Sequence, residues 1–327
     1  MRWASQLPQS PELTLSNPEF CLTVRTVLGL PLSDDLPALC PCNTGVRPSD
    51  PEHHDHPLTC PKHKKRAQNI RHDNLRRVLG SVATHAAGLS QQPEVHHSPD
   101  PDAPADSPMH RRAYRPDLAL TGGRPGLLHI DVTVVHPAAA SYVVSASRHA
   151  RATVHKAELQ KEKDCKEWAE HVGAHFLAFG IETYGALGLQ ELRVVNHIAR
   201  AAAALPTHPS FVGINPAARV RNELLNRISI ELQRGNARVI VEALREARTC
   251  YQTKAFVKKV KKADTTAARR HSAPAAGRRM LLPSVCRLRH ATMSWRKRVR
   301  AVRAVRAVSV LVRTMKVPGL PIRSPLK

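Results

Sequence analysis

The residues best suited to chemistry are two aspartates, Asp117 and Asp131, which lie fourteen positions apart. Asp131 interrupts the apolar, β-branched run 127–135, which predicts a strand. Glycines and a proline within 122–126 predict a hairpin, so the two aspartates should lie on neighbouring strands. A carboxylate inside an apolar strand is costly unless it faces a cation. Mg²⁺ is commonly held by one or two carboxylates while water and phosphate oxygens complete its shell, so the pair suits phosphodiester cleavage.

A simpler interpretation of this pair stays open. Asp117 follows Pro116 and would then cap a turn, while Asp131 would pair with a nearby arginine. A Pro-Asp pair followed by a second aspartate is a short and common pattern, which makes it a weak signal in isolation. The residues around the pair therefore decide between the two interpretations.

A group of cysteines and histidines forms a second candidate site. It contains Cys40, Cys42, His53, His54, His56, Cys60 and His63. Three cysteines and one histidine can close a tetrahedral zinc site in a proline-rich segment that has no core of its own. We expect Zn²⁺ to be held by Cys40, Cys42, His56 and Cys60, with His53, His54 or His63 as substitutes. The alternative is unligated thiols beside a solvated loop, because Cys-x-Cys is tighter than the usual spacing of zinc ligands.

Two segments with helical patterns carry positive charge. Apolar residues at 70, 75, 78, 79 and 82 have helical spacing, and the Lys and Arg residues of 62–77 gather on the opposite side. The segment 146–172 predicts a long charged helix, which places Lys156, Lys163 and Lys166 before Trp168. Such charge runs are usually solvated helix faces. The functional alternative is contact with a nucleic-acid backbone.

The order of these motifs resembles the restriction-endonuclease-like domain at the C-terminal end of some non-LTR retrotransposon polyproteins, a branch of the PD-(D/E)xK nuclease group. The resemblance rests on Arg115-Pro116-Asp117, on 131–137, on the helix-like segment 156–168 and on 176–188. It covers roughly residues 15–245. It implies an α/β fold: a restriction-endonuclease-like mixed sheet flanked by helices, preceded by a small zinc-binding loop and followed by a basic tail.

The resemblance also implies which residues act. Asp117 and Asp131 would hold Mg²⁺ or Mn²⁺. The broad group has its catalytic lysine two residues beyond the second acid, but that position is Thr133 here. In the retrotransposon branch the lysine lies on the next helix, one or two turns before an aromatic residue, where tyrosine is more usual than Trp168. The candidates are therefore Lys163, Lys156 and Lys166.

Supporting roles follow from the same resemblance. Glu94, Arg115 and Glu182 are expected to support the metal site, although Glu94 also fits an ordinary loop glutamate. The family carries a CCHC-type zinc knuckle whose His-x-x-x-Cys half matches His56 and Cys60. His72-Asp73 also occurs at this point in the family, and it would either act in catalysis or position the knuckle against the core.

The charge of the chain is concentrated in its last part. The formal net charge is +24, and residues 248–327 hold 22 Lys and Arg residues against one acidic residue, Asp264, which leaves +3 for the first 247. Such a tail cannot bury enough apolar surface to fold alone, so we expect it to be largely disordered and to add affinity for phosphate backbones. DNA is the expected partner and RNA a second candidate. No membrane or small-molecule partner is expected.

Seven cysteines scattered over the chain argue against a disulfide framework, and no run is long and apolar enough to span a membrane. We therefore expect a soluble, nuclear protein. The expected parts are an N-terminal remnant of the kind that follows a polymerase region in the resembling family (1–36), a zinc-knuckle-like segment (37–66), the restriction-endonuclease-like domain (67–247) and the tail (248–327). The polymerase signature, an aromatic-Ala-Asp-Asp turn, is missing, because Asp34-Asp35 follows Leu32-Ser33.

Two functions remain in competition. The first is a metal-dependent DNA endonuclease of retrotransposon origin that nicks target DNA by phosphodiester hydrolysis. The second is a catalytically inactive nucleic-acid-binding remnant of such a polyprotein. The intact pair of aspartates favours the enzyme, and the displaced lysine together with the missing polymerase favours the remnant.

Overall fold

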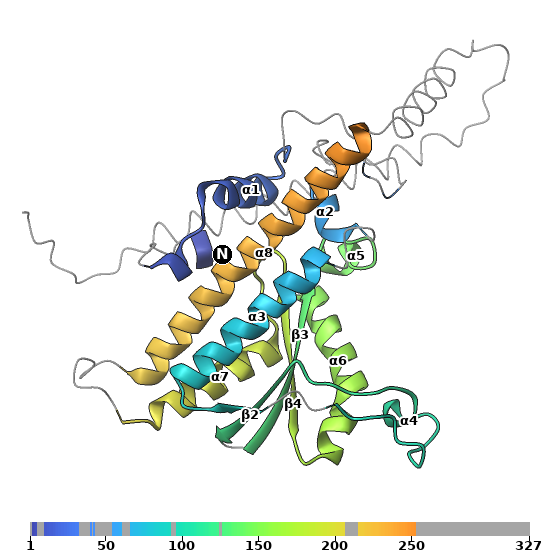
Figure 1. The fold of residues 1–327 in the computed structure, drawn as a ribbon, viewed down its shortest axis with the longest axis vertical. Coiled ribbons are helices and arrows are strands. Elements are labelled where there is room, and N and C mark those ends of the chain that lie inside the picture. The colour runs from blue at the N-terminus through green and yellow to red at the C-terminus, as the bar shows by residue number, and fades with distance from the viewer. Residues whose placement is uncertain are drawn as a thin grey trace, which may run out of the picture. The chain divides into compact units, whose positions relative to one another are not determined.

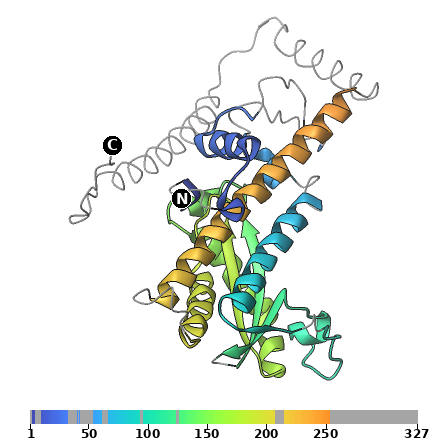
Figure 2. The ribbon, with the colours of Figure 1, turned by 60° about the vertical axis from the view of Figure 1, so that its left-hand side comes forward.

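The computed structural model describes residues 2–4, 10–32, 40, 42, 54–60, 66–92, 96–123, 126–206 and 215–252 (Figures 1 and 2). Contacts divide the chain into a unit of residues 1–266 and a unit of residues 267–327. Every element described below belongs to the first unit. Two expected features, the supporting carboxylate of Glu94 and the basic tail beyond Gln252, lie outside the described residues.

The described helices and strands alternate along the chain, as in a mixed α/β protein. The helices are η1 (Arg2–Ala4), η2 (Pro11–Leu13), α1 (Asn17–Leu28), α2 (His56–Thr59), α3 (Arg66–His85), α4 (Pro108–Arg111), α5 (Val143–Ala146), α6 (Ala152–His171), α7 (Leu189–Ala203) and α8 (Pro216–Gln252). The strands are β1 (Ser90–Gln91), β2 (Leu118–Gly123), β3 (Gly126–Val135) and β4 (His175–Glu182). Among these helices none is long and apolar enough to cross a bilayer.

The four strands form one mixed sheet in the order β1-β2-β3-β4. The pairs β1·β2 and β2·β3 are antiparallel, whereas β3 and β4 run parallel and are joined through the crossover helix α6. The hairpin expected between Asp117 and Asp131 is therefore confirmed. Its glycines are required by the backbone, because Gly122 has φ +100° and Gly126 has φ +109°, values that side-chain-bearing residues rarely adopt.

The alternation of side chains along β3 assigns each face of the sheet to different helices. Leu128, Ile130 and Val132 are buried in the main core with residues of α3, α7 and α8. The intervening residue Asp131 faces the other way and contacts Lys161 of α6. Figure 1 shows α3 and α8 side by side, apart from α6 (Figure 1). The flanked mixed sheet expected from the sequence is therefore present.

Local sequence signals explain where several helices begin and end. At α1, Ser16 and Glu19 form a reciprocal capping box, and Gly29 ends the helix with φ +68°. Asn215 directly precedes α8, and its side chain accepts a hydrogen bond from Ala218 N in the first turn of that helix. This helix continues to Gln252, past the domain boundary expected at residue 247, and Ala247 is buried.

A helix cap and aromatic contacts hold the segment 96–114 in place. Ser107 caps the short helix α4 by accepting a hydrogen bond from Met109 N. Tyr114 stacks on Trp168 of α6, with 6.1 Å between ring centroids, and on His97 at 5.8 Å. The aromatic residue that follows the candidate lysines therefore anchors this segment onto α6.

A buried carboxylate joins α6 to α7. Glu158 of α6 accepts hydrogen bonds from the backbone nitrogens of Leu189, Gln190 and Glu191 at 3.1 to 3.2 Å, and so caps the N-terminus of α7. Gly180 and Gly188 make room for it. A Cβ at Gly188 would lie 1.9 Å from a Glu158 oxygen, so this position requires glycine.

Replacing Glu191 by glutamine is expected to raise the melting temperature by a few degrees near pH 8 and to leave it unchanged near pH 4. Burial, together with the nearby charge of Glu158, raises the pKa of Glu191 well above its usual 4.5, although Gly188 N and Arg151 oppose this. Because the unfolded chain releases this proton first, wild-type stability falls as pH rises above about 4.5, and the neutral amide removes that loss. Thermal unfolding from pH 4 to 8 tests this, with the exposed Glu170→Gln as control.

Candidate functional site

Asp117 and Asp131 meet where β2 begins and β3 continues beyond it. Leu118 of β2 pairs with Ile130 of β3, so the residues on either side of this pair, Asp117 and Asp131, are neighbours across the hairpin. The Oδ2 atom of Asp117 accepts a hydrogen bond of 2.7 Å from Val132 N. This contact replaces a strand partner that β2 does not supply, and it fixes the Asp117 carboxylate beside Asp131.

His72 of α3 completes a group of three possible metal ligands. Its Nε2 lies 2.9 Å from Asp117 Oδ2, and its Nδ1 lies 3.3 Å from Asp73 Oδ1. One ligand atom from each of His72, Asp117 and Asp131 lies within 4.8 Å of the others. Octahedral ligands at about 2.1 Å from Mg²⁺ are separated by about 3.0 to 4.2 Å, so small side-chain movements would suit the group to a divalent ion.

Lysine 161 is the cation nearest to this group. Its Nζ lies 2.8 Å from Asp131 Oδ2, and the thiol of Cys165 lies 3.5 Å from the same oxygen. Lys161 and Cys165 are one helical turn apart, so both side chains point from α6 toward β3. Asp131 is only 8% exposed, which makes this ammonium group its main compensation in the described chain.

The electrostatics of the two aspartates differ. Burial, and then the hydrogen bond and negative charge of Asp117, raise the pKa of Asp131 to about 7 against the opposing Lys161. Burial alone would raise the pKa of Asp117, but hydrogen bonds with His72, Asp131 and Val132 N outweigh it and hold that pKa well below the usual range. The pair therefore carries less than two full negative charges near neutral pH unless a cation joins it.

Lys161 was not among the lysines expected from the sequence, and the structure places the three that were, Lys156, Lys163 and Lys166, elsewhere on α6. Lys156 lies over the ring of Tyr142, 5.5 Å from its centroid, and Lys166 pairs with Glu162 at 3.5 Å. Lys163 is exposed. A signal for Lys161 existed in the sequence, because Ala157, Glu158, Lys161, Cys165 and Trp168 recur at helical spacing and form one stripe of α6.

Of the expected supporting residues, the structure places Glu182 away from the two aspartates. Arg115 is exposed. Glu182 pairs with Val135, four residues beyond Asp131, and its carboxylate accepts a hydrogen bond from Val154 N at the start of α6. Burial raises the pKa of Glu182, consistent with a buried helix cap. Glu94 lies outside the described residues.

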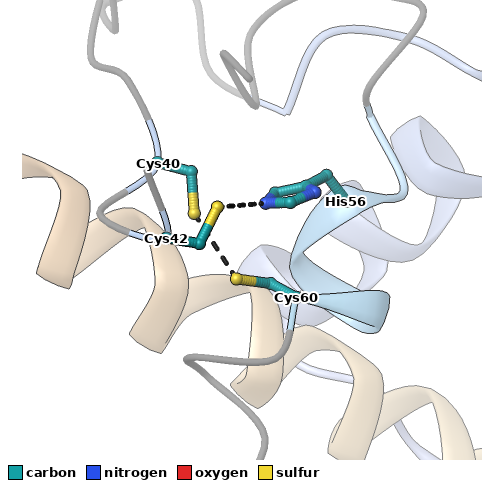
Figure 3. A group of neighbouring side chains, drawn as sticks. All are labelled: Cys40, Cys42, His56 and Cys60. Carbon is teal, nitrogen blue, oxygen red and sulfur yellow. Dashed lines mark hydrogen bonds between the residues drawn. The ribbon is translucent and has the colours of Figure 1, made fainter. Parts of the chain in front are cut away.

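The four expected zinc ligands converge at one point (Figure 3). Cys40 Sγ lies 3.5 Å from Cys60 Sγ, and Cys42 Sγ lies 3.4 Å from His56 Nε2. Tetrahedral ligands at about 2.0 to 2.3 Å from Zn²⁺ are separated by about 3.3 to 3.8 Å, so this cluster could bind a metal ion such as zinc. His56 and Cys60 meet because the single turn α2 places positions i and i+4 on one side.

The substitutes proposed for this cluster are not used in the described chain. His54 lies beside Gly29, and His53 and His63 fall outside the described residues. Leu58 of α2 packs into a small second core with Leu32, Val239 and Ile240. This core ties the cluster to α8.

A buried chain of polar contacts leads from the cluster toward His72. Asp55, next to the ligand His56, lies 3.2 Å from His136 Nε2, and His136 Nδ1 lies 2.7 Å from Thr183 Oγ1. The carbonyl of Thr183 accepts a hydrogen bond from Asn236, which accepts one from Arg71 at 2.7 Å. Each of these four inner residues is at most 5% exposed. Because Arg71 precedes His72, one continuous network supports both candidate sites.

The two sites thus combine donor sets of different chemical character. Thiolates with one imidazole suit a structural zinc ion, whereas carboxylates with one imidazole and a lysine can hold a cation beside a phosphate. Comparison with models of known protein families gives no match, and comparison with curated proteins gives none either.

Proposed function

We propose that this chain is a metal-dependent DNA endonuclease of retrotransposon origin that nicks its target by phosphodiester hydrolysis. The observation that carries the proposal is the meeting of Asp117, Asp131 and His72 with Lys161 where β2 begins beside β3. Two carboxylates can hold a divalent cation, and an adjacent ammonium group can stabilise the charge that develops on a phosphate.

The residues take separate roles in this proposal. Asp117 and Asp131 bind and orient a Mg²⁺ or Mn²⁺ ion, and Val132 N keeps the Asp117 carboxylate in place. The ion supplies Lewis-acid polarisation of the phosphate and a more acidic water. With an ion held by Asp131, the Lys161 ammonium group, which now pairs with that carboxylate at 2.8 Å, would be available to the non-bridging phosphate oxygens.

The Cys/His cluster has a structural role in the same proposal. We infer that Zn²⁺ is its ion, because three thiols and one imidazole form a donor set that zinc prefers. Cys40, Cys42, His56 and Cys60 would hold the ion and so close the segment around α2, which Asp55 joins to His136 just after β3. DNA is the proposed partner, with the basic residues of 248–327 adding phosphate contacts and the nucleus as the site of action.

One observation favours the inactive nucleic-acid-binding alternative. The ion pair between Lys161 and Asp131 already neutralises the more buried carboxylate. A former metal site that no longer binds an ion would keep this arrangement. Under this alternative the cluster and the tail bind nucleic acid, and divalent ions change nothing.

The proposal is tested by nicking of supercoiled plasmid with Mg²⁺ or Mn²⁺. The wild-type chain is expected to nick, and Asp131→Asn is expected to lower the nicking rate about 1,000-fold or more. DNA binding by Asp131→Asn in gel shifts should stay the same or tighten, because the substitution removes a negative charge beside the phosphate. Asp164→Asn on α6 makes the same chemical change outside the site and should leave both readouts unchanged. No nicking by the wild type, or equal nicking by Asp131→Asn, would support the inactive alternative.

A further inference from the structure

We propose that His72 is itself a metal ligand through Nε2, that Asp73 orients its ring, and that the resulting donor set binds Mn²⁺ in preference to Mg²⁺. The inference rests on the proposed function for the presence of a divalent ion at Asp117 and Asp131. It adds a third ligand and a metal preference.

The position of His72 is fixed by a rigid element. Leu75 and Leu79 of the same helix are completely buried in the main core. The preceding residue Arg71 is 4% exposed and donates a hydrogen bond to Asn236 of α8. Gly235 allows this approach, since a Cβ there would lie 2.4 Å from the Arg71 side chain. The imidazole of His72 is therefore held beside Asp117 by packing between α3 and α8.

The second ring nitrogen of His72 is engaged as metal-bound histidines require. Nδ1 lies 3.3 Å from Asp73 Oδ1 and Nε2 lies 2.9 Å from Asp117 Oδ2, while one ring nitrogen lies within 4.8 Å of an Asp131 oxygen. Metal-binding histidines almost always donate their other N–H to a carboxylate or carbonyl, because this fixes the tautomer and the ring orientation. Asp73 supplies that partner from the adjacent position, so it is a positioning residue for His72.

A competing role for His72 is simple hydrogen-bond donation to Asp117. In that role Nε2 carries a proton and cannot bind an ion, and any donor of similar length would serve. Glutamine can donate to Asp117 but offers no aromatic nitrogen. The two roles therefore make different predictions for His72→Gln.

The chemistry of imidazole leads to the metal preference. Mg²⁺ prefers oxygen ligands and keeps several waters, whereas imidazole nitrogen binds transition-metal ions more strongly. A set of two carboxylates and one imidazole should therefore hold Mn²⁺ more tightly than Mg²⁺. Loss of the imidazole should reduce Mn²⁺ affinity far more than Mg²⁺ affinity.

The test uses the full-length chain with its Cys/His cluster saturated with zinc. Mn²⁺ binding is measured from the electron paramagnetic resonance signal of the free ion, and Mg²⁺ binding by competition. Pulsed experiments detect direct nitrogen coordination. We expect about 10-fold tighter binding of Mn²⁺ than of Mg²⁺, with a nitrogen coupling on the bound ion. His72→Gln should remove that coupling and weaken Mn²⁺ binding about 10-fold to 100-fold, while Mg²⁺ binding changes less than about 3-fold.

Three further variants separate the outcomes. Asp73→Asn should weaken Mn²⁺ binding about 10-fold with the nitrogen coupling retained. Asp131→Asn should abolish binding at this site, and His85→Gln at the exposed end of α3 should change nothing. Mn²⁺ bound without nitrogen coupling, an unchanged preference in His72→Gln, or no binding of either ion would overturn the inference. Nicking that depends on Asp131 would then still support the proposed function, whereas nitrogen-coupled Mn²⁺ without nicking would support this inference alone.

Discussion

Replacing Lys161 by methionine is expected to lower the nicking rate about 100-fold to 1,000-fold, the loss that follows removal of one charge-stabilising donor from an active site. Lys161 is the cation in contact with Asp131, at 2.8 Å, and its side chain is 35% exposed, so it can reach both the carboxylate and an approaching phosphate. Methionine keeps the length and apolar contacts of the lysine stem and removes only the ammonium group. The rate of plasmid nicking at saturating Mg²⁺ is the measurement.

Lys163→Met is the matched control for this variant. It removes the same charge two positions away on the same helix, where the side chain is exposed, and it should change nicking less than about 3-fold. Lys161→Arg keeps a cation and should restore part of the rate. A larger loss in Lys163→Met than in Lys161→Met would favour the assignment made from the sequence resemblance over that made from the geometry.

The sequence predicts the elements that position the carboxylate pair well. β-Branched residues in 127–135 and the glycines of the hairpin specify β3 and its antiparallel partner β2, so Asp117 and Asp131 had to be neighbours. These predictions succeed because short-range backbone preferences decide them.

The lysine and the histidine depend on contacts between distant segments. Which lysine of α6 faces β3 is decided by the rotation of the helix against the sheet, and that rotation is set by Glu158, which caps α7, and by Trp168, which stacks on Tyr114. Charge patterns on one helix carry no information about these partners. His72 lies 45 residues before Asp117 in the sequence. It reaches that aspartate only because α3 packs along α8.

The Cys/His cluster shows the opposite case. Local spacing was enough to choose Cys40, Cys42, His56 and Cys60, because one helical turn and a Cys-x-Cys pair bring ligands together without a large core. Its attachment to the sheet was not predictable. The contacts of Asp55, His136 and Thr183 join residues more than forty positions apart, and no periodic pattern in the sequence predicts them.

Replacing Cys60 by serine is expected to abolish stoichiometric zinc binding and to lower the melting temperature by about 10 °C or more. Cys60 is completely buried beside Cys40, and burial raises the pKa of the Cys40 thiol well above its usual value. The Cys40 thiol therefore stays protonated unless a metal ion is present. Zinc binding contributes about 10 to 16 kcal/mol to the folding free energy of isolated zinc-finger peptides. A larger domain can lose part of such a contribution and still remain folded.

Without zinc, we expect the folded structure to loosen first near the cluster, and then at the sheet through the contact of Asp55 with His136. Limited proteolysis of the zinc-free chain should cut first around residues 54–60, while α3 and α8, whose packing depends on Leu75 and Ile228, resist longer. Cys21→Ser is the control, because Cys21 is an exposed free thiol on α1 and should leave zinc content and melting temperature unchanged. Zinc content near one ion per chain in Cys60→Ser, or an unchanged melting temperature after chelation of a zinc-loaded wild type, would contradict a structural metal site.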